Sequence, residues 1–435
     1  MTRSVLLASA AAVALMAAPA AAQDQSITVG WAAWDPANAL VELSRDFTEQ
    51  TGIEVEFVFI PWPSFTAEVF NELNAGGDTF DVLIGDSQWI GAGAELGHYV
   101  QLNDFFDERG ISMDDFLPAT VFAYSTWPKG EPNYYALPAM GDALAWTYRT
   151  DWFERFGDEF EAEYGYPLDV PETWDQLRDI GTFFQGREID GQTVYGMAIN
   201  TERGSEGITM GVTAAMYAWG MEYDNPENPY EMDGYFNAEN VVEALEFYRE
   251  IYECCTPPGW ADAYMQENLD AYTSGQVAMQ MNWYAFFPGI SRHPEVGPVT
   301  GFFSNPSQEV AAATLGGQGM SVVSYSDNQD LALEYIAWFA QPDVQQRWWD
   351  LGGYSCHVDV LGDPGFLDSA VYAQGFLDSM QIVQDFWQEP AYADLMLIMQ
   401  EHVHNYVVAG EGNAQDALDT IVEEWTEVFE DEGIL

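Results

Sequence analysis

Apolar and polar residues alternate over the first part of the chain in a pattern that predicts strands and helices in turn. Residues 26–33 and 53–60 are dense in β-branched and aromatic side chains, and residues 80–84 are apolar except for Asp81, so all three segments are predicted strands. Between the first two strands, apolar residues recur at helical spacing, with Asp35 as the expected N-cap and Pro36 as the first helical residue. A second helix is expected over 65–73. This alternation predicts a parallel sheet built from βαβ units.

The remaining pattern predicts a second α/β unit followed by helices. Residues 133–148 hold two extended apolar pieces around Pro138 and Gly141. Further strands are expected at 194–199, 277–282 and 312–323, the last of them broken by the glycines of 316–319. Helices are expected from Trp174 onward and over 241–252, 268–274, 329–340, 342–351, 391–408 and 414–430. The chain is therefore predicted to make one α/β unit, cross to a second, cross back and end in helices.

We therefore expect an α/β fold of two lobes with hinge-crossing segments and a helical C-terminal tail. The expected crossings lie near Pro138–Gly141 and Gly301–Pro306. The expected division is a first lobe of residues 23–138 plus 307–349 and a second lobe of residues 139–306 plus 350–435. Since open α/β sheets bind ligands at the carboxyl ends of their strands, a cleft between the lobes is the expected binding site.

The first 22 residues have the layout of a secretory signal peptide. Arg3 supplies a short basic region, Val5–Leu15 is an apolar run, and Ala20–Ala22 supplies a small-residue cleavage site. The apolar run is too short to span a bilayer, and we expect no membrane helix in the rest of the chain. The mature protein is expected to begin near Gln23 and to work in the periplasm.

The charge of the chain excludes several kinds of partner. It carries 71 acidic and 12 basic residues, for a net charge of −59, and its single lysine is Lys129. Such a charge repels nucleic acid and anionic lipid, so neither is an expected partner. An acidic, lysine-poor surface is typical of proteins in a salty medium, where screening weakens self-repulsion. Because pairs of carboxylates then occur by chance, such a pair does not by itself indicate a hydrolase.

Three cysteines, Cys254, Cys255 and Cys356, bear on the redox state of the chain. In an oxidising periplasm two of them are expected to bond, and the expected disulfide joins Cys356 to Cys254 or Cys255. The alternatives are a strained bridge between the adjacent pair and three free, buried thiols. A bridge that closes a loop of about 100 residues contributes up to ~4.7 kcal/mol of stability.

Large aromatic residues gather where predicted strands end. They are Trp31, Trp34, Trp62, Trp89, Trp283 and Tyr284. These are loop positions rather than periodic core positions. An aromatic face stacks on the C–H face of a sugar, while neighbouring Asp, Asn and Gln side chains hydrogen-bond its hydroxyls. We expect at least two of the tryptophans to contact a ligand, the alternative being that they fill the seam between the lobes.

Three carboxylates and a glycine-rich segment are the polar candidates. Asp35 begins a helix, where it can cap the backbone and also help to bind a ligand oxygen. Asp86 directly follows a buried strand and is expected at the mouth of the cleft, and Asp142 lies in the expected hinge. Around Gly317 and Gln318 the backbone can approach a ligand closely, although a tight turn explains the glycines as well. We find no sequence motif for a metal or a cofactor, and none is expected.

Six segments in this order resemble the extracellular solute-binding proteins of ABC importers, the large sugar-binding family that includes the maltose-binding proteins. They are ITVGWAAWDPANALVELSRDFTEQTGIEVEF (27–57), FDVLIGDSQWIGAGAELGHYVQL (80–102), YALPAMGDALAWTYRTDWF (135–153), PETWDQL (171–177), YTSGQVAMQMNWYAF (272–286) and GGQGMSVVSYSDNQDLALEYIAWF (316–339). The resemblance implies two α/β lobes that close on a ligand. It also implies ligand contacts from Trp34, Asp35, Asp86, Gln88, Trp89, Asp142 and Trp283. Lysines often reach sugar hydroxyls in this family, but this chain has almost none, so Asn, Gln or Arg is expected in their place.

We therefore expect a monomeric periplasmic protein that captures a mono- or oligosaccharide, delivers it to the permease of an ABC importer and breaks no bond. One alternative is a binder of a polyol or a zwitterionic osmolyte, because aromatic cages also hold quaternary ammonium groups. A second is a periplasmic carbohydrate-active enzyme that uses two of Asp35, Asp86 and Asp142. A third is a binding module that signals to a receptor.

Overall fold

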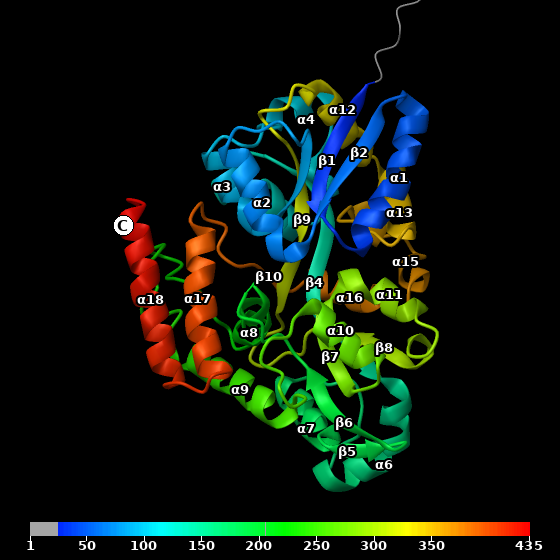
Figure 1. Ribbon diagram of the computed structural model, residues 1–435, viewed down its shortest axis with the longest axis vertical. Helices are drawn as coiled ribbons and strands as arrows, with labels where there is room; N and C mark the ends of the chain where they lie inside the picture. The colour runs from blue at the N-terminus through cyan, green and yellow to red at the C-terminus, as the bar shows by residue number, and fades with distance from the viewer. Residues whose placement is uncertain (1–24, 205) are drawn as a thin grey trace, which may run out of the picture.

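One sheet path runs through both halves of the molecule. In the computed structural model, which describes residues 25–204 and 206–435, the ten-stranded sheet follows the order β2-β1-β3-β9-β4-β7-β6-β5, with β10 paired to β9 and β8 paired to β4. Figure 1 shows the first strands with their helices at the top and the last strands with theirs at the bottom, which gives the two lobes of the expected α/β fold. The expected signal peptide lies outside the described residues.

The first lobe is the βαβ unit that the hydrophobic pattern predicts. Its elements are β1 (Ser26–Ala32), α1 (Asp35–Thr51), β2 (Glu54–Ile60), α2 (Trp62–Asn74), β3 (Val82–Asp86), α3 (Ile90–Glu95), α4 (Asn103–Arg109), α5 (Pro118–Ser125), α12 (Gln329–Phe339) and α13 (Pro342–Asp350). Strands β2 and β3 both pair with β1 in parallel. The carboxyl ends of these three strands therefore meet at one edge of the lobe, which faces the second lobe (Figure 1).

The start of α1 differs from the expectation by one residue. Trp34 is the N-cap, with an extended backbone at φ −154° and ψ 177°, and Asp35 is the first residue of the helix. Asp35 is therefore not the capping residue, because Pro36 fits the second helical position as well as the first. The end of the helix is as predicted, at Gly52, which has a left-handed φ of 77°.

The second lobe also combines strands with helices. Its elements are α6 (Thr150–Tyr164), α7 (Trp174–Phe184), β5 (Arg187–Ile189), β6 (Gln192–Ala198), α8 (Gly207–Ala218), α9 (Glu239–Cys255), α10 (Met265–Thr273), β7 (Val277–Trp283), α11 (Phe287–Arg292) and β8 (Thr300–Phe303). The sequence pattern did not predict α8. Every residue of this helix is buried, so it has no polar face and shows no helical alternation.

Two long strands, β4 (Leu137–Arg149) and β9 (Ala313–Val322), connect the lobes. Residues 137–143 of β4 pair with β9, and residues 144–149 pair with β7 and β8. The two extended pieces expected around Pro138 and Gly141 are thus one strand. Strand β9 is continuous, so the expected break at its glycines is wrong, because these glycines take part in the ladder. The chain returns through β9, whereas β8, at the expected Gly301–Pro306 crossing, pairs with β4 inside the second lobe.

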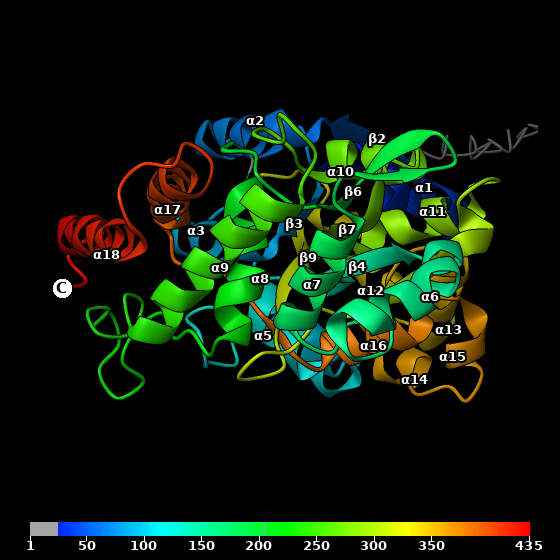
Figure 2. The ribbon, with the colours of Figure 1, turned by 90° about the horizontal axis from the view of Figure 1, so that it is seen from below.

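The C-terminal segment is helical, as predicted. It comprises α14 (Val358–Leu361), α15 (Phe366–Ser369), α16 (Ala373–Met380), the short strand β10 (Val383–Gln384), α17 (Tyr392–Val407) and α18 (Ala414–Asp431). Helices α17 and α18 pack against each other and against α9, and α17 also packs against α8. Figures 1 and 2 both show α17 and α18 side by side at one edge of the molecule. Within the described residues, no helix is long and apolar enough to cross a membrane.

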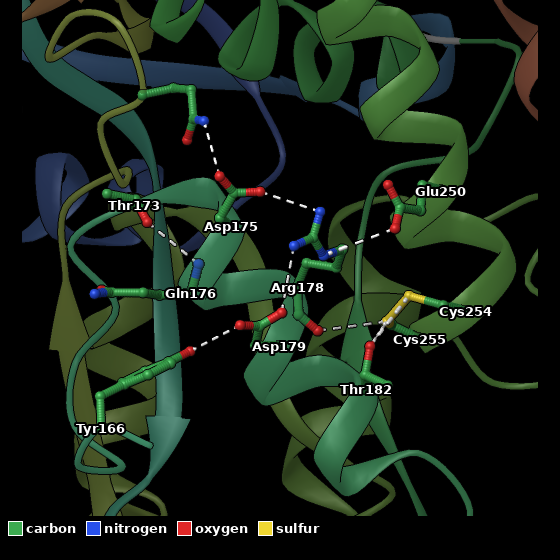
Figure 3. Close-up of polar contacts among 11 residues, drawn as sticks. Tyr166, Thr173, Asp175, Gln176, Arg178, Asp179, Thr182, Glu250, Cys254 and Cys255 are labelled. Carbon is green, nitrogen blue, oxygen red and sulfur yellow. Dashed lines mark hydrogen bonds and ion pairs between the residues drawn. A yellow bond between two sulfur atoms is a disulfide. The ribbon is translucent and has the colours of Figure 1, made fainter. Parts of the chain in front are cut away.

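The disulfide pairing differs from the expected one. The structure joins Cys254 to Cys255 at the end of α9, where Thr182 of α7 lies beside them (Figure 3). Cys356 is a free, fully buried thiol. Its sulfur lies next to Gly141 of β4, whereas that of Cys255 lies next to Gly181 of α7. The fold thus places the sulfurs of Cys356 and Cys255 against different elements, and the expected bridge between them stays a prediction.

Candidate ligand site between the lobes

A narrow cavity lies where the two lobes and the connecting strands meet. Its lining comes from the first lobe, the second lobe and the two long strands together. The lining residues are Trp34, Trp62, Asp86, Gln88, Asp142, Glu206, Met210, Met265, Trp283, Leu315, Gly316, Gly317 and Gln318. This set, which we call the central cavity, contains eight of the ten residues that the sequence proposed as ligand contacts.

The register of the sheet brings the polar candidates together. Asp86, the last residue of β3, pairs with Gln318 of β9. Two residues along β9, Gly316 pairs with Asp142 of β4. Leu144 of β4 in turn pairs with Trp283 at the end of β7. Because β9 and β4 lie between β3 and β7, these side chains form one row across the centre of the molecule, although 232 positions of sequence separate Asp86 from Gln318.

Three tryptophan rings form the aromatic part of the lining. The rings of Trp34 and Trp62 lie 5.7 Å apart between centroids, at an interplanar angle of 34°. Trp283 comes from the second lobe, and its Nε1 donates a 3.0 Å hydrogen bond to the hydroxyl of Tyr264. The hydroxyl of Tyr264 donates to Oε1 of Glu206 at 3.0 Å. Each lobe therefore contributes an aromatic surface, and the ring of Trp283 is held in place by a hydrogen-bonded chain.

The glycines of β9 let the strand pass close to its neighbours. At Gly316, a Cβ atom would lie 2.6 Å from Cζ3 of Trp283, so this ring packs flat on the strand. Gly317 has a left-handed φ of 92°, and a Cβ there would lie 2.3 Å from the carbonyl oxygen of Met140. Both positions thus require glycine, the first for ring packing and the second for backbone conformation.

Three carboxyl groups line the central cavity. Burial, together with the charge of Asp385, raises the pKa of Asp86 to about 7. Burial also raises the pKa of Asp142 and of Glu206 well above their usual range. Asp142 is 1% exposed, and backbone N–H groups, including that of Ala143 at 2.8 Å, donate to it. Asp142 is thus mainly bonded to the chain itself, whereas Asp86 and Glu206 are partly exposed to the cavity.

Two buried hydrogen-bond donors on lining residues have no partner among the residues that the structure describes. Gln318 is 1% exposed; its Oε1 accepts from Nε1 of Trp31, and its Nε2 bonds to nothing. Nε1 of Trp34 is also buried without a partner. A buried unpaired donor lowers the stability of the fold by about 1–3 kcal/mol, so both groups are suited to donate a hydrogen bond to an oxygen of a ligand.

Two residues that the sequence proposed as contacts do not line the central cavity. Trp89 is 2% exposed and packs in the first lobe against Phe65 and Phe70, with ring centroids at 4.9 and 5.4 Å. Asp35 lies on an outer hollow that shares Trp34 and Trp62 with the cavity. Both residues belong to the right loops, but their side chains point elsewhere.

Sequence reasoning missed Glu206. This residue precedes the unpredicted helix α8 and has a left-handed backbone, with φ 67°. Non-glycine residues in this conformation are uncommon and gather at functional sites. The apolar run that follows Gly207 is the one signal that pointed to a helix beginning here.

In the part of the chain that the structure describes, neither a basic group in the lining nor a metal site is found. Lys129 lies in a separate hollow with Asp385 and Glu389, where burial lowers its pKa to about 7. Its Nζ donates to the carbonyl oxygen of Phe122 at 2.8 Å. Over the described residues 25–204 and 206–435, no group of three or more His, Cys, Asp or Glu side chains is placed to hold a metal ion.

Two α/β lobes joined by crossing strands, with a cavity at their junction, define the fold of the periplasmic binding proteins. Residues 32–346 match the bacterial extracellular solute-binding proteins, and the chain belongs to that family. Among curated relatives, it is 24% identical over 350 residues to a probable amino-acid ABC transporter periplasmic-binding protein of Sinorhizobium fredii, covering 79% of this chain and 75% of that one. It is 26% identical over 234 residues to the mannitol-binding protein of Pseudomonas aeruginosa, covering 52% of this chain and 49% of that one.

Solved structures share the fold over nearly the whole chain. The maltose-bound MalE3 of T. maritima superposes with a TM-score of 0.79 at 21% identity, covering 93% of this chain and 99% of that one. A ribitol complex of an ABC transporter solute-binding protein from Agrobacterium radiobacter has a TM-score of 0.78 at 18% identity, with the same coverage. The resemblance inferred from the sequence is thereby confirmed at the level of family and fold.

Proposed function

We propose that this protein is the periplasmic solute-binding component of an ABC importer and that it captures a small polyhydroxylated solute, a sugar or a polyol. The observation that carries this proposal is the central cavity, in which tryptophan rings from both lobes meet amide and carboxyl groups. Indole rings stack on the C–H faces of such a solute, and unpaired donors on Gln318 and Trp34 suit its hydroxyl oxygens. One relative is named a mannitol-binding protein, and two solved structures with this fold contain maltose and ribitol.

The proposed mechanism is capture followed by closure of the lobes around β4 and β9. Contacts from Trp34, Trp62 and Asp86 on one side and from Trp283 and Glu206 on the other favour the closed form only when a guest touches both. The closed surface is then what a permease recognises. We propose that the protein acts as a monomer, and that the carboxyls bind rather than catalyse, so no bond of the solute is broken.

A thermal-shift screen of sugars and polyols tests this proposal. Maltose, mannitol, ribitol and common monosaccharides are added to the mature protein, and a binding solute at 100 times its dissociation constant adds about 2.7 kcal/mol of stability. We expect at least one solute to raise the melting temperature and to be recovered unchanged after incubation. A hydrolysed solute favours the carbohydrate-active enzyme instead, and no shift by any hydroxylated solute contradicts the proposal.

A further inference from the structure

Two carboxyl groups line the central cavity from opposite lobes. Asp86 comes from the end of β3 in the first lobe, and Glu206 from the residue before α8 in the second lobe. Asp86 accepts a hydrogen bond from the backbone N–H of Ser87 at 2.9 Å, and Glu206 accepts one from the hydroxyl of Tyr264. Each carboxyl has two oxygens and about four acceptor sites, so both keep acceptor capacity for a guest.

Among residues 25–204 and 206–435, no basic side chain lines the cavity to neutralise these carboxyls. None of the described residues that line it is Lys, Arg or His. Arg203, three positions before Glu206, is ion-paired with Glu401 at 3.1 Å. The other charges that act on the pair, Asp142, Glu202 and Asp385, are acidic as well. When the lobes approach each other, like charges therefore accumulate at the cavity.

The acidic surface of the protein does not account for this arrangement. Adaptation to salt concerns carboxylates exposed to solvent, whereas carboxyls in a closed cavity are costly to ionise. Unlike these surface carboxylates, the pair shares its cavity with the unpaired amide Nε2 of Gln318 and the unpaired indole N–H of Trp34, both buried. These two donors need acceptor oxygens, and the two carboxyls can accept from donors.

We infer that the guest of this site is a small hydroxylated amine, an amino sugar or amino polyol. Its ammonium group lies between Asp86 and Glu206, and its hydroxyl oxygens accept hydrogen bonds from Gln318 and Trp34. The inference rests on the proposed function and narrows its substrate class. The rings of Trp34, Trp62 and Trp283 suit such a guest, since an aromatic face attracts a cation as well as a C–H surface.

Matched pairs of solutes that differ in one group test the inference. Calorimetry on the mature protein just above neutral pH compares D-glucosamine with D-glucose, and glucamine with sorbitol. We expect the amine of at least one pair to bind about tenfold more tightly than its neutral partner. The variants Asp86→Asn and Glu206→Gln are each expected to remove most of this preference. Glu243→Gln, the same change on the exposed face of α9, is the control and is expected to retain it.

The outcomes separate this inference from the proposed function. If the neutral member of each pair binds as well as the amine, the inference is wrong and the sugar or polyol function stands. If no member of either pair binds but maltose, ribitol or mannitol does, the same conclusion holds. If none of these solutes binds, both the inference and the proposed function are contradicted. Retention of the amine preference in both Asp86→Asn and Glu206→Gln also overturns the inference.

Discussion

The ring of Trp283 packs directly on Gly316, so that a side chain at residue 316 would occupy the space of the indole. Gly316→Ala is expected to displace the ring and weaken binding about tenfold or more, measured by calorimetry with the solute that gives the largest thermal shift. Gly157→Ala is the control, because a Cβ at that position on α6 meets nothing within 4 Å. Equal affinity in both variants would show that the ring of Trp283 takes no part in binding.

Replacing Trp283 is expected to weaken ligand binding, whereas replacing Trp89 is expected to lower the stability of the fold. Trp283→Ala removes a ring from the central cavity and is expected to weaken binding at least about tenfold while the fold is retained. Trp89→Ala removes a ring from the core of the first lobe and is expected to lower the free energy of unfolding by about 3–5 kcal/mol. Calorimetry and urea denaturation on both variants check this, and a large loss of affinity in folded Trp89→Ala would return Trp89 to the site.

Gly317 is expected to be the least replaceable glycine of β9. Gly317→Ala combines a left-handed φ of 92° with a contact of 2.3 Å to the backbone of β4, and a loss of more than about 3 kcal/mol of stability is expected. Gly165→Ala separates the two effects, because Gly165 has a similar φ of 82° but open space around it, and about 1–2 kcal/mol is expected there. Similar losses in both variants, by urea denaturation, would mean that the contact to β4 relaxes.

The ligand-free protein is expected to lose stability as the pH rises from about 4 to about 7. Asp86 has its pKa raised to about 7 in the folded state, so between the unfolded value near 4 and this value the folded chain binds the extra proton. The contribution of Asp86 to the free energy of unfolding therefore falls over this range and levels off above it. Urea denaturation in high salt, which screens the surface charges, measures the slope.

Asp86→Asn provides the comparison for this pH dependence. The variant is expected to have a shallower slope than the wild type, because one proton-linked group is removed. Glu243→Gln, on the exposed face of α9, is expected to keep the wild-type slope. If Asp86→Asn and the wild type lose stability in parallel, the carboxyl of Asp86 titrates near its ordinary pKa.

Cys356 is expected to react with alkylating agents only after unfolding. The thiol is fully buried beside β4, and burial raises its pKa to about 12. Without reductant, the native protein is expected to resist alkylation and the unfolded protein to take up one label, at Cys356. Peptide mapping by mass spectrometry checks this, and a peptide that links residue 356 to residue 254 or 255 would restore the pairing expected from the sequence.

Local pattern was sufficient for much of the fold. The strands around β1 and β2, the end of α1 at Gly52 and the two tail helices were predicted because each depends on residues close in sequence. Helix α8 was not predicted because a helix that is buried on all sides shows no alternation of apolar and polar residues. The break expected in β9 was wrong because glycines are permissive, and only the neighbouring strands decide whether they turn or stay extended.

By itself, the sequence determined the class of fold and the loops from which a site is built, since strand ends and tryptophan positions are properties of short segments. Which side chains meet was decided by the tertiary structure alone. Trp34 and Trp89 look alike in sequence, yet one lines the central cavity and the other fills a core. Glu206 joins Asp86 only because β9 and β4 bring the two lobes together. Side-chain direction and long-range register depend on packing between distant segments, and no local pattern contains that information.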